Sequence, residues 1–390
     1  MKKLTKILIG YFVIIIFKIL SKFYNFKFFH LYTERIGHLT TDLDSALFVV
    51  PEKTIIFIGH ENVANNFILN FFKKQRKIYF SKFFLKIMSC IIVADPNSNL
   101  ILRHEEIHLD FSTHLKFKSK IKFPIFSDHK KNNILNRYKI KPKFVGLYSR
   151  NNLYFTKNEI FDPNFHDFKN FNFKDYNLVI KYLINKNNSV IKLGETYPNE
   201  DLGYFDNNII TSLDYSSNDE IDYFLHANSR YNVYSNSGAS GVAEILRKKS
   251  VYINLIPFSW YKLSKLAPDS IILPKKILNL KNNRFLTFKE IFEYEGEGIS
   301  SIHTTVDPYK KNNLNYIDNS PQEILDAVIE MEDKLIGNKE NDESIKLNNL
   351  FWKSISSKEN FERIDYLKNE LRLTVSSNFL KSNLYLIDNE

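Results

Sequence analysis

Short apolar runs alternate with longer mixed segments along most of the chain. In the first half, residues 28–32 and 54–58 are continuous apolar runs, and residues 44–48 and 64–72 carry apolar side chains at helical spacing. A short apolar run is typical of a strand buried on both faces, whereas helical spacing predicts an amphipathic helix. Strand followed by helix, repeated, indicates parallel βα units. Residues 95–143 are polar and irregular, and the pattern assigns no element there.

A second series of alternations begins at Phe144. The predicted strands are residues 144–148, 189–193, 208–211, 231–234, 251–255 and 270–273. The predicted helices are residues 175–184, 218–227, 239–248 and 321–335. The last of these has Pro321 in its first turn and Ser320 as its N-cap. Six alternations in this order predict a doubly wound parallel sheet, and the break between the two halves falls near residues 136–143.

The N-terminal segment is apolar and flanked by lysines. Residues 7–20 fall short of the length of about 20 residues that crosses a bilayer, and no cleavage site follows. The lysines are Lys2, Lys3 and Lys6 before the apolar run and Lys18 and Lys22 after it. Two interpretations remain, an interfacial membrane anchor with snorkelling lysines or a buried first helix. The lack of a polar face favours the anchor.

Composition narrows the class of protein. A chain of 390 residues with 44% hydrophobic side chains indicates two globular domains. The net charge of +10 suits nucleic acid, anionic membranes or phosphorylated substrates. Because the lysines are spread along the chain and no nucleic-acid module is evident, we expect no nucleic-acid partner. The single cysteine, Cys90, excludes an intramolecular disulfide and fits a reducing compartment.

No metal site is expected from the histidines. Residues 104–108, His-Glu-Glu-Ile-His, come close to a zinc-binding helix motif, but they stand in a run of charged residues. We interpret this segment as an exposed charged stretch.

The strongest local signal is a Ser/Gly turn after the predicted strand at residues 231–234. Ser235, Ser237 and Gly238 stand in this turn, which opens a predicted helix. Exposed amides and the helix dipole bind anions at such a turn, and glycine permits a close approach of the backbone to a phosphate. An ordinary serine N-cap with a turn glycine is an equally good interpretation.

Other polar residues are predicted at the same sheet edge. Gly194 and Glu195 follow one strand, and Arg150 follows the first strand of the series. Open α/β sheets bind ligands at the carboxyl ends of their strands, where a cation can offset the charge of a pyrophosphate. Arg150 is otherwise a surface arginine. His166 with Asp167 is either an acid–base pair or a solvated loop pair.

The first half offers candidates for a general base. His38, Asp42 and Asp44 follow the predicted strand at residues 28–32, and His38 stands directly after Gly37. Histidine is the side chain that ordinarily titrates near neutral pH, and His38 is therefore the first choice. Asp44 is equally well explained as a helix N-cap.

Several of these segments together resemble a family. They are residues 35–38, 150–151, 166–170, 191–194, 235–238, 284–288 and 377–380. In this order they are similar to bacterial GT-B glycosyltransferases encoded with surface-polysaccharide genes. The resemblance covers roughly residues 30–385. It implies an α/β fold of two Rossmann-like domains facing a cleft, here with an N-terminal apolar helix. With the pattern of the chain, we expect the domains 1–24, a possible membrane anchor; 25–140, for the acceptor; 141–338, for the nucleotide sugar; and 339–390, a helical tail.

The resemblance implies transfer of a sugar from a nucleotide sugar to a glycan or lipid-linked acceptor. We expect an inverting enzyme without metal or other cofactor, in the cytoplasm and peripheral on the inner face of the cell membrane. The catalytic candidates are His38, Asp42 and Asp44. The donor-binding candidates are Arg150, His166, Asp167, Lys169, Asn170, Lys192, Gly194, Glu195, Ser235, Ser237 and Gly238.

The chain departs from the family pattern at three of these positions. Lys169 and Lys192 stand where arginine is expected, and Asn151 stands where aspartate is expected. Lysine keeps the charge but loses the bidentate geometry of arginine. The alternatives are a nucleotide-sugar epimerase of the same fold and a non-catalytic glycan-binding protein.

Overall fold

The computed structural model describes residues 3–108, 123–151, 167–196, 202, 208–215, 218–295 and 308–387. The chain divides into two compact units, Met1–Ile125 and Phe126–Glu390. The first helix of the second unit is α7 (Asp128–Arg137), so the observed boundary precedes the one predicted at residue 140. Both units are mixed α/β with parallel sheets, as predicted.

The N-terminal unit is built on a parallel sheet with strand order β3-β2-β1-β4. Its strands are β1 (Phe26–His30), β2 (Ile55–Gly59), β3 (Ile78–Phe80) and β4 (Ile101–Leu102). The first strand of the chain therefore lies inside the sheet, with β2 on one side and β4 on the other. The strand order reverses between β1 and β4. Strands β1 and β2 correspond to predicted strands, whereas β3 and β4 were not predicted.

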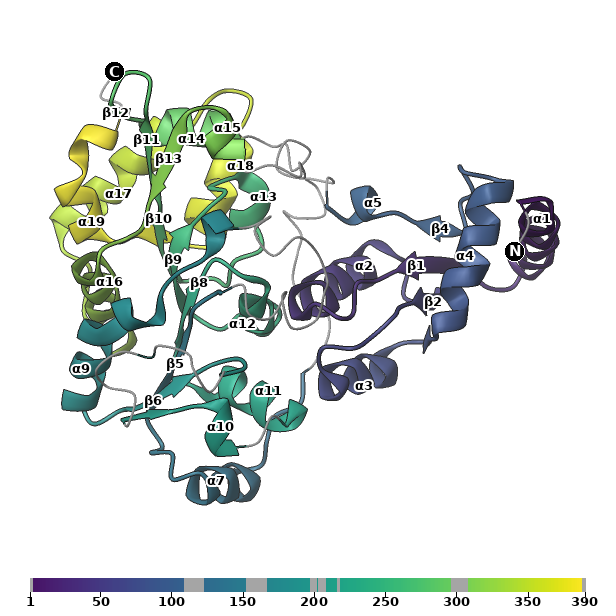
Figure 1. Cartoon of the computed structure of the whole chain (residues 1–390), viewed down its shortest axis with the longest axis horizontal. Helices are drawn as coiled ribbons and strands as arrows, with labels where there is room; N and C mark the ends of the chain where they lie inside the picture. The colour runs from purple at the N-terminus through teal and green to yellow at the C-terminus, as the bar shows by residue number, and fades with distance from the viewer. Residues whose placement is uncertain are drawn as a thin grey trace. The chain divides into compact units, whose positions relative to one another are not determined.

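The helices of this unit follow its strands. They are α1 (Lys3–Leu20), the π-helical turn η1 (His38–Asp42), α2 (Leu43–Val49), α3 (Asn66–Gln75), α4 (Lys82–Ala94) and α5 (His104–His108). Side-chain caps start two of them, because Asn65 Oδ1 accepts from the N–H of Ile68 and Ser81 Oγ from that of Phe83. Helix α1 lies against α4 (Figure 1).

The inner face of α1 belongs to the hydrophobic core of the unit. Val13, Ile14 and Phe17 pack on a buried cluster formed by Phe28, Met88, Ile91, Leu100 and Ile101. The ring of Phe17 lies 5.2 Å from that of Phe28, on β1, and 5.6 Å from that of Phe57, on β2. Successive side chains of a strand point to opposite faces, and Phe29 therefore faces away from this cluster.

The outer face of α1 is open to solvent. Gly10 is the one residue of the helix that is buried, and large apolar side chains from Leu4 to Leu20 are exposed. Helix α1 is therefore buried on its inner face and exposed on its outer face. No helix among the described residues is both long enough and apolar enough to span a bilayer.

The C-terminal unit contains a parallel sheet of seven described strands, in the order β14-β10-β9-β8-β5-β6-β7. They are β5 (Phe144–Tyr148), β6 (Ser189–Lys192), β7 (Ile209–Ile210), β8 (Asn232–Ser235), β9 (Ser250–Leu255), β10 (Ile271–Pro274) and β14 (Thr374–Val375). The first strand, β5, lies between β6 and β8, and the strand order reverses at β5/β8. In open α/β sheets this reversal opens the crevice that holds a ligand.

Helices cover both faces of this sheet. Helices α9 and α16 lie on one side, and α11 and α12 lie on the other (Figure 1). The longer ones are α9 (Asn177–Asn185), α11 (Asp219–Asn228), α14 (Phe288–Glu295), α16 (Pro321–Leu335) and α17 (Asp342–Ser354). The shorter ones are α10 (Ser212–Tyr215), α12 (Gly241–Leu246), α13 (Trp260–Leu263), α15 (Pro308–Lys311), α18 (Phe361–Asp365) and α19 (Ser377–Ser382). Ser320 caps α16 in a capping box with Glu323.

Single turns and a small sheet complete the unit. The turns are η2 (Asp167–Lys169), η3 (Phe173–Tyr176), η5 (Gly238–Ser240), η7 (Tyr366–Glu370) and η8 (Leu384–Leu386). Strands β11 (Lys276–Asn279), β12 (Arg284–Phe285) and β13 (Leu314–Ile317) form an antiparallel sheet. The predicted helical tail, 339–390, also supplies β14, which pairs with β10. The tail is therefore part of the sheet and its core.

The contact at Gly10 generates a test of how α1 is seated. A Cβ at this position would overlap the carbonyl oxygen of Cys90 and lie 2.6 Å from Cβ of Ala94. We expect Gly10→Ala to push α1 off α4 and to lower the free energy of unfolding by about 1–3 kcal/mol. Thermal unfolding followed by circular dichroism measures this, with Thr5→Ala, on an exposed position of the same helix, as the control. An unchanged midpoint for Gly10→Ala would contradict the close packing.

Candidate functional site

A buried hydrogen bond joins the two loops at the reversal of the C-terminal sheet. Arg150 follows β5, and Ser235 is the last residue of β8. The backbone N–H of Arg150 donates to Ser235 Oγ at 2.7 Å, and the two residues are only 6% and 0% exposed. The hydroxyl of Ser235 therefore fixes the two loops to each other at the point where a doubly wound sheet binds its ligand.

The side chain of Arg150 is held by Asn170, the residue that follows η2. Its guanidinium donates to Asn170 Oδ1, and Asn170 Nδ2 donates to Asp167 Oδ1 at 3.0 Å. The N–H of Phe171 donates to the carbonyl of Arg150 at 2.9 Å. The structure thus brings three predicted donor-site residues, Arg150, Asp167 and Asn170, into one chain of hydrogen bonds. His166 lies outside the described residues.

The two lysines predicted at the donor site, Lys169 and Lys192, have different surroundings. Lys192, the last residue of β6, is 2% exposed, and its Nζ donates to the carbonyl of Glu195 at 3.1 Å. Its ammonium group also lies 5.7 Å from the ring of Phe173. Lys169 places its ammonium 5.4 Å from the ring of Phe168, its neighbour in the chain. Lys192 is therefore enclosed by the loop after β6, whereas Lys169 is the last residue of η2.

Gly194 and Glu195 shape the loop that encloses Lys192. Gly194 has a φ of +79°, in the left-handed region that favours glycine, and a Cβ there would lie 2.9 Å from Cε2 of Tyr148. Glu195 contributes its carbonyl to Lys192 and exposes its side chain. This pair thus positions a backbone turn beside the end of β5.

The Ser/Gly turn after β8 has a capping serine and an exposed glycine. Ser237 Oγ accepts from the N–H of Ala239 at 3.2 Å and caps η5, and Gly238 is exposed. The helix predicted at residues 239–248 is divided into η5 and α12 and ends at Arg247, whose φ is +53°. The serine-cap interpretation of Ser237 is thus present in the structure, beside a glycine backbone that faces solvent.

The N-terminal sheet carries a second group of polar residues at its own reversal. His104, on α5 after β4, places Nε2 3.0 Å from the carbonyl oxygen of His30, the last residue of β1. Its Nδ1 lies 3.9 Å from Asp42 Oδ2. The interpretation of residues 104–108 as an exposed charged stretch is wrong for His104, because the buried Ile107 fixes α5 to the core and His104 faces inward.

His38 and Asp42 form the closest acid–base pair of this edge. His38 Nδ1 lies 2.5 Å from Asp42 Oδ2, and the two side chains are 34% and 3% exposed. Residues four apart share one face of a helical turn, and η1 therefore presents both. The ring of Tyr32 lies 5.5 Å from that of His38 and 5.7 Å from that of His104. We refer to His30, Tyr32, His38, Asp42 and His104 as the histidine edge.

The geometry assigns tautomers and charges at the histidine edge. A carboxylate accepts hydrogen bonds, so Nδ1 of His38 carries a proton where it faces Asp42. Burial lowers the pKa of His104, against an opposing effect of Asp42 that raises it. Burial lowers the pKa of His30 as well. His30 and His104 are therefore neutral near pH 7. Neither was a candidate site residue from the sequence, although His30 ends β1 and His104 begins the helix that follows β4.

Asp44 is buried but takes a different position from the other candidates. It lies in the first turn of α2 and is 2% exposed. The N-cap position of α2 belongs to Asp42, which makes no side-chain cap bond, so the N-cap interpretation of Asp44 is wrong. Asp42, and not Asp44, lies against His38.

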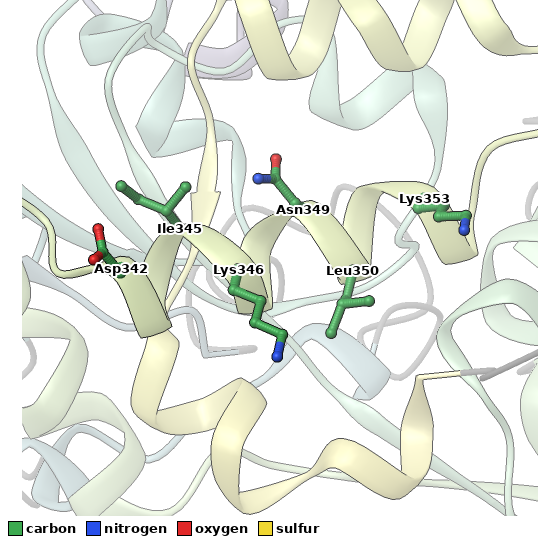
Figure 2. A pocket seen from close by; sticks show the side chains of 6 residues that line it. All are labelled: Asp342, Ile345, Lys346, Asn349, Leu350 and Lys353. Atoms are coloured by element: carbon green, nitrogen blue, oxygen red, sulfur yellow. The ribbon is translucent and has the colours of Figure 1, made fainter.

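Neither edge coincides with a candidate metal cluster or with the hollow drawn in Figure 2. No group of three or more His, Cys, Asp or Glu in the part of the chain that the structure describes could hold a metal ion. The hollow has a volume of about 320 Å³ and is lined by one helix, α17 (Figure 2). Its lining residues are Asp342, Ile345, Lys346, Asn349, Leu350 and Lys353.

Comparison with known proteins gives one structural likeness. The structure of E. coli ADP-heptose LPS heptosyltransferase II is similar to this chain with a TM-score of 0.46 and 14% sequence identity. The match covers 80% of this chain and 98% of that chain. No protein-family model matches the sequence, and no curated protein matches it. The function proposed below therefore rests on the residues of the two sheet edges.

The neutral state of His104 generates a prediction for the pH dependence of stability. Because folding lowers its pKa, the unfolded chain binds more protons, and stability is lost as the pH falls below the ordinary value of 6.5. We expect His104→Gln, which cannot titrate, to lose less stability than the parent between about pH 7 and pH 5. Urea unfolding at several pH values measures this, with His129→Gln, at an exposed position on α7, as the control. Parallel curves for parent and His104→Gln would contradict the burial of a neutral imidazole.

Proposed function

We propose that this chain is a glycosyltransferase of the GT-B architecture. It transfers a sugar from a nucleoside diphosphate sugar to a hydroxyl group of a glycan or lipid-linked acceptor, in the synthesis of a bacterial surface polysaccharide. The observation that supports the proposal is that each of the two parallel sheets has a different set of polar side chains at the reversal of its strand order. A His–Asp pair lies at the reversal of one sheet, and an anchored arginine lies at the reversal of the other.

The histidine edge supplies the base in this proposal. His38 Nε2 takes the proton of the acceptor hydroxyl, while Asp42 holds Nδ1 and stabilises the imidazolium that forms. The acceptor oxygen then forms a bond to the anomeric carbon on the face opposite the leaving group. His104 lies 3.9 Å from the same carboxylate, but its Nε2 is directed to the carbonyl of His30, and we do not assign it as the base.

The C-terminal edge receives the leaving group. As the bond from the anomeric carbon to the diphosphate oxygen breaks, its electron pair remains on the nucleoside diphosphate. Arg150 offsets this charge, and its bond to Asn170 holds the guanidinium before the donor binds. The exposed Gly238 leaves room for a phosphate near the backbone of the turn after β8. We assign this charge compensation to the protein and propose no metal for it.

The setting that we propose is the cytoplasm. The single cysteine is buried and free, as expected in a reducing compartment.

The donor edge is tested by binding of nucleoside diphosphates. A ligand at a hundred times its dissociation constant adds about 2.7 kcal/mol to stability. A thermal-shift screen of nucleoside diphosphates therefore identifies the nucleobase of the donor. We expect Arg150→Gln to lower the affinity for the tightest-binding nucleoside diphosphate at least about tenfold, because a charge-assisted hydrogen bond to the phosphate is lost. The affinity for the nucleoside alone should stay nearly unchanged. Ile336→Ser, at a 67% exposed position of the same unit, is the control. An equal loss for nucleoside and diphosphate would remove Arg150 from the phosphate site.

The general base is tested by measuring kcat with the nucleotide sugar that the binding screen identifies. We expect His38→Gln and Asp42→Asn each to lower kcat by a factor of about 10² to 10⁴, with donor affinity unchanged. The double variant should be no slower than the worse single one, because the two groups act as a unit. His129→Gln serves as the control. Values of kcat within a few-fold of the parent would place the base elsewhere, and sugar turnover without an acceptor would favour an epimerase.

A further inference from the structure

The outer face of α1 is a continuous apolar stripe. Its positions follow the spacing i, i+4, i+7, i+8, i+11 and i+15, which places them within one side of a helix. We call these residues the outer stripe: Leu4 (68% exposed), Leu8 (63%), Tyr11 (51%), Phe12 (66%), Ile15 (56%) and Ile19 (58%). Apolar side chains so exposed along an entire helix mark a surface that another apolar phase covers.

The opposite face of α1 fixes the helix to the N-terminal unit. Phe17 lies in the core between β1 and β2, and Gly10 meets the backbone of α4 at Cys90. Lys6 Nζ also donates to Ser89 Oγ at 2.9 Å. The helix is thus held along the body of the unit, and a surface that takes up the outer stripe must lie parallel to the helix axis.

The lysines around the outer stripe indicate which kind of surface covers it. Lys3 stands at one end of α1, and Lys18 and Lys22 stand at the other, all exposed. Neither α1 nor α4 contains an acidic residue, and α4 adds the exposed Lys82 and Lys86. A second copy of the chain would bring these lysines against one another, which is unfavourable. An anionic surface pairs with all of them.

We propose that the outer stripe of α1 lies in the plane of a bilayer that contains anionic lipids. Its apolar side chains enter the boundary between head groups and acyl chains, and the lysines at both ends extend to the phosphates. Phe23 and Tyr24, 76% and 50% exposed, continue this surface just beyond the helix. The inference concerns binding to a surface and does not depend on the sugar transfer.

Vesicle co-sedimentation of the full chain tests it. We expect tight binding to vesicles of phosphatidylcholine mixed with phosphatidylglycerol and weak binding to phosphatidylcholine alone. Phe12→Ser with Ile15→Ser should lower the partition coefficient on the mixed vesicles at least tenfold. The double variant Lys18→Gln/Lys22→Gln should lower the partition coefficient on the mixed vesicles by about fivefold for each lysine removed. Its binding to phosphatidylcholine alone should stay unchanged. Phe361→Ser, 61% exposed in the other unit, is the matched control and should bind as the parent does.

Substitution is preferred to deletion here, because removal of residues 1–24 would take Phe17 out of the core. Unchanged circular dichroism and unfolding midpoints verify that the stripe variants fold. Two results would overturn the proposal. One is binding of the Phe12/Ile15 variant to mixed vesicles at the parent level. The other is a dimer that the same variant dissociates, together with no binding of the parent to vesicles, since a second copy would then cover the stripe.

Discussion

The placement of the first strand inside a parallel sheet is the constraint on which both candidate sites depend. Parallel strands end at one edge, and the loops diverge where the strand order reverses. In both units a side chain at or just after the end of the neighbouring strand, β8 or β4, bonds the backbone at the end of the first strand. Ser235 accepts from Arg150 N–H at β5/β8, and His104 meets the carbonyl of His30 at β1/β4. At each reversal a hydrogen bond thus joins the ends of the two strands that flank it.

This shared arrangement carries different chemistry in the two units. At β1/β4 the bond uses an imidazole, and His38 and His104 both lie against the Asp42 carboxylate. At β5/β8 it uses a small hydroxyl, so that the guanidinium of Arg150 is directed to Asn170. One edge is thereby suited to moving a proton, and the other to meeting negative charge. Each set is local to its own sheet.

The sequence predicted the elements whose ends are marked by local chemistry. Strand β5 and helix α16 have the predicted limits, because an apolar run between turns defines the former and a capping box the latter. Strands β4 and β14 were missed because two residues show no periodicity. Arg150 was predicted at the edge from the end of its strand, whereas Asn170 was expected only from the family resemblance. The role of His104 was missed because its inward orientation depends on Ile107, a tertiary contact.

The close contact at Gly10 determines the direction in which the outer stripe of α1 faces. Successive residues of an α-helix are rotated by about 100°, so a slip of one residue against α4 would turn the outer stripe into the flank of the unit. A side chain at Gly10 is excluded by the backbone at Cys90, and this contact holds the helix at one azimuth. The tilt at which the N-terminal sheet stands above any surface that binds the stripe is thereby set by a single residue that has no side chain.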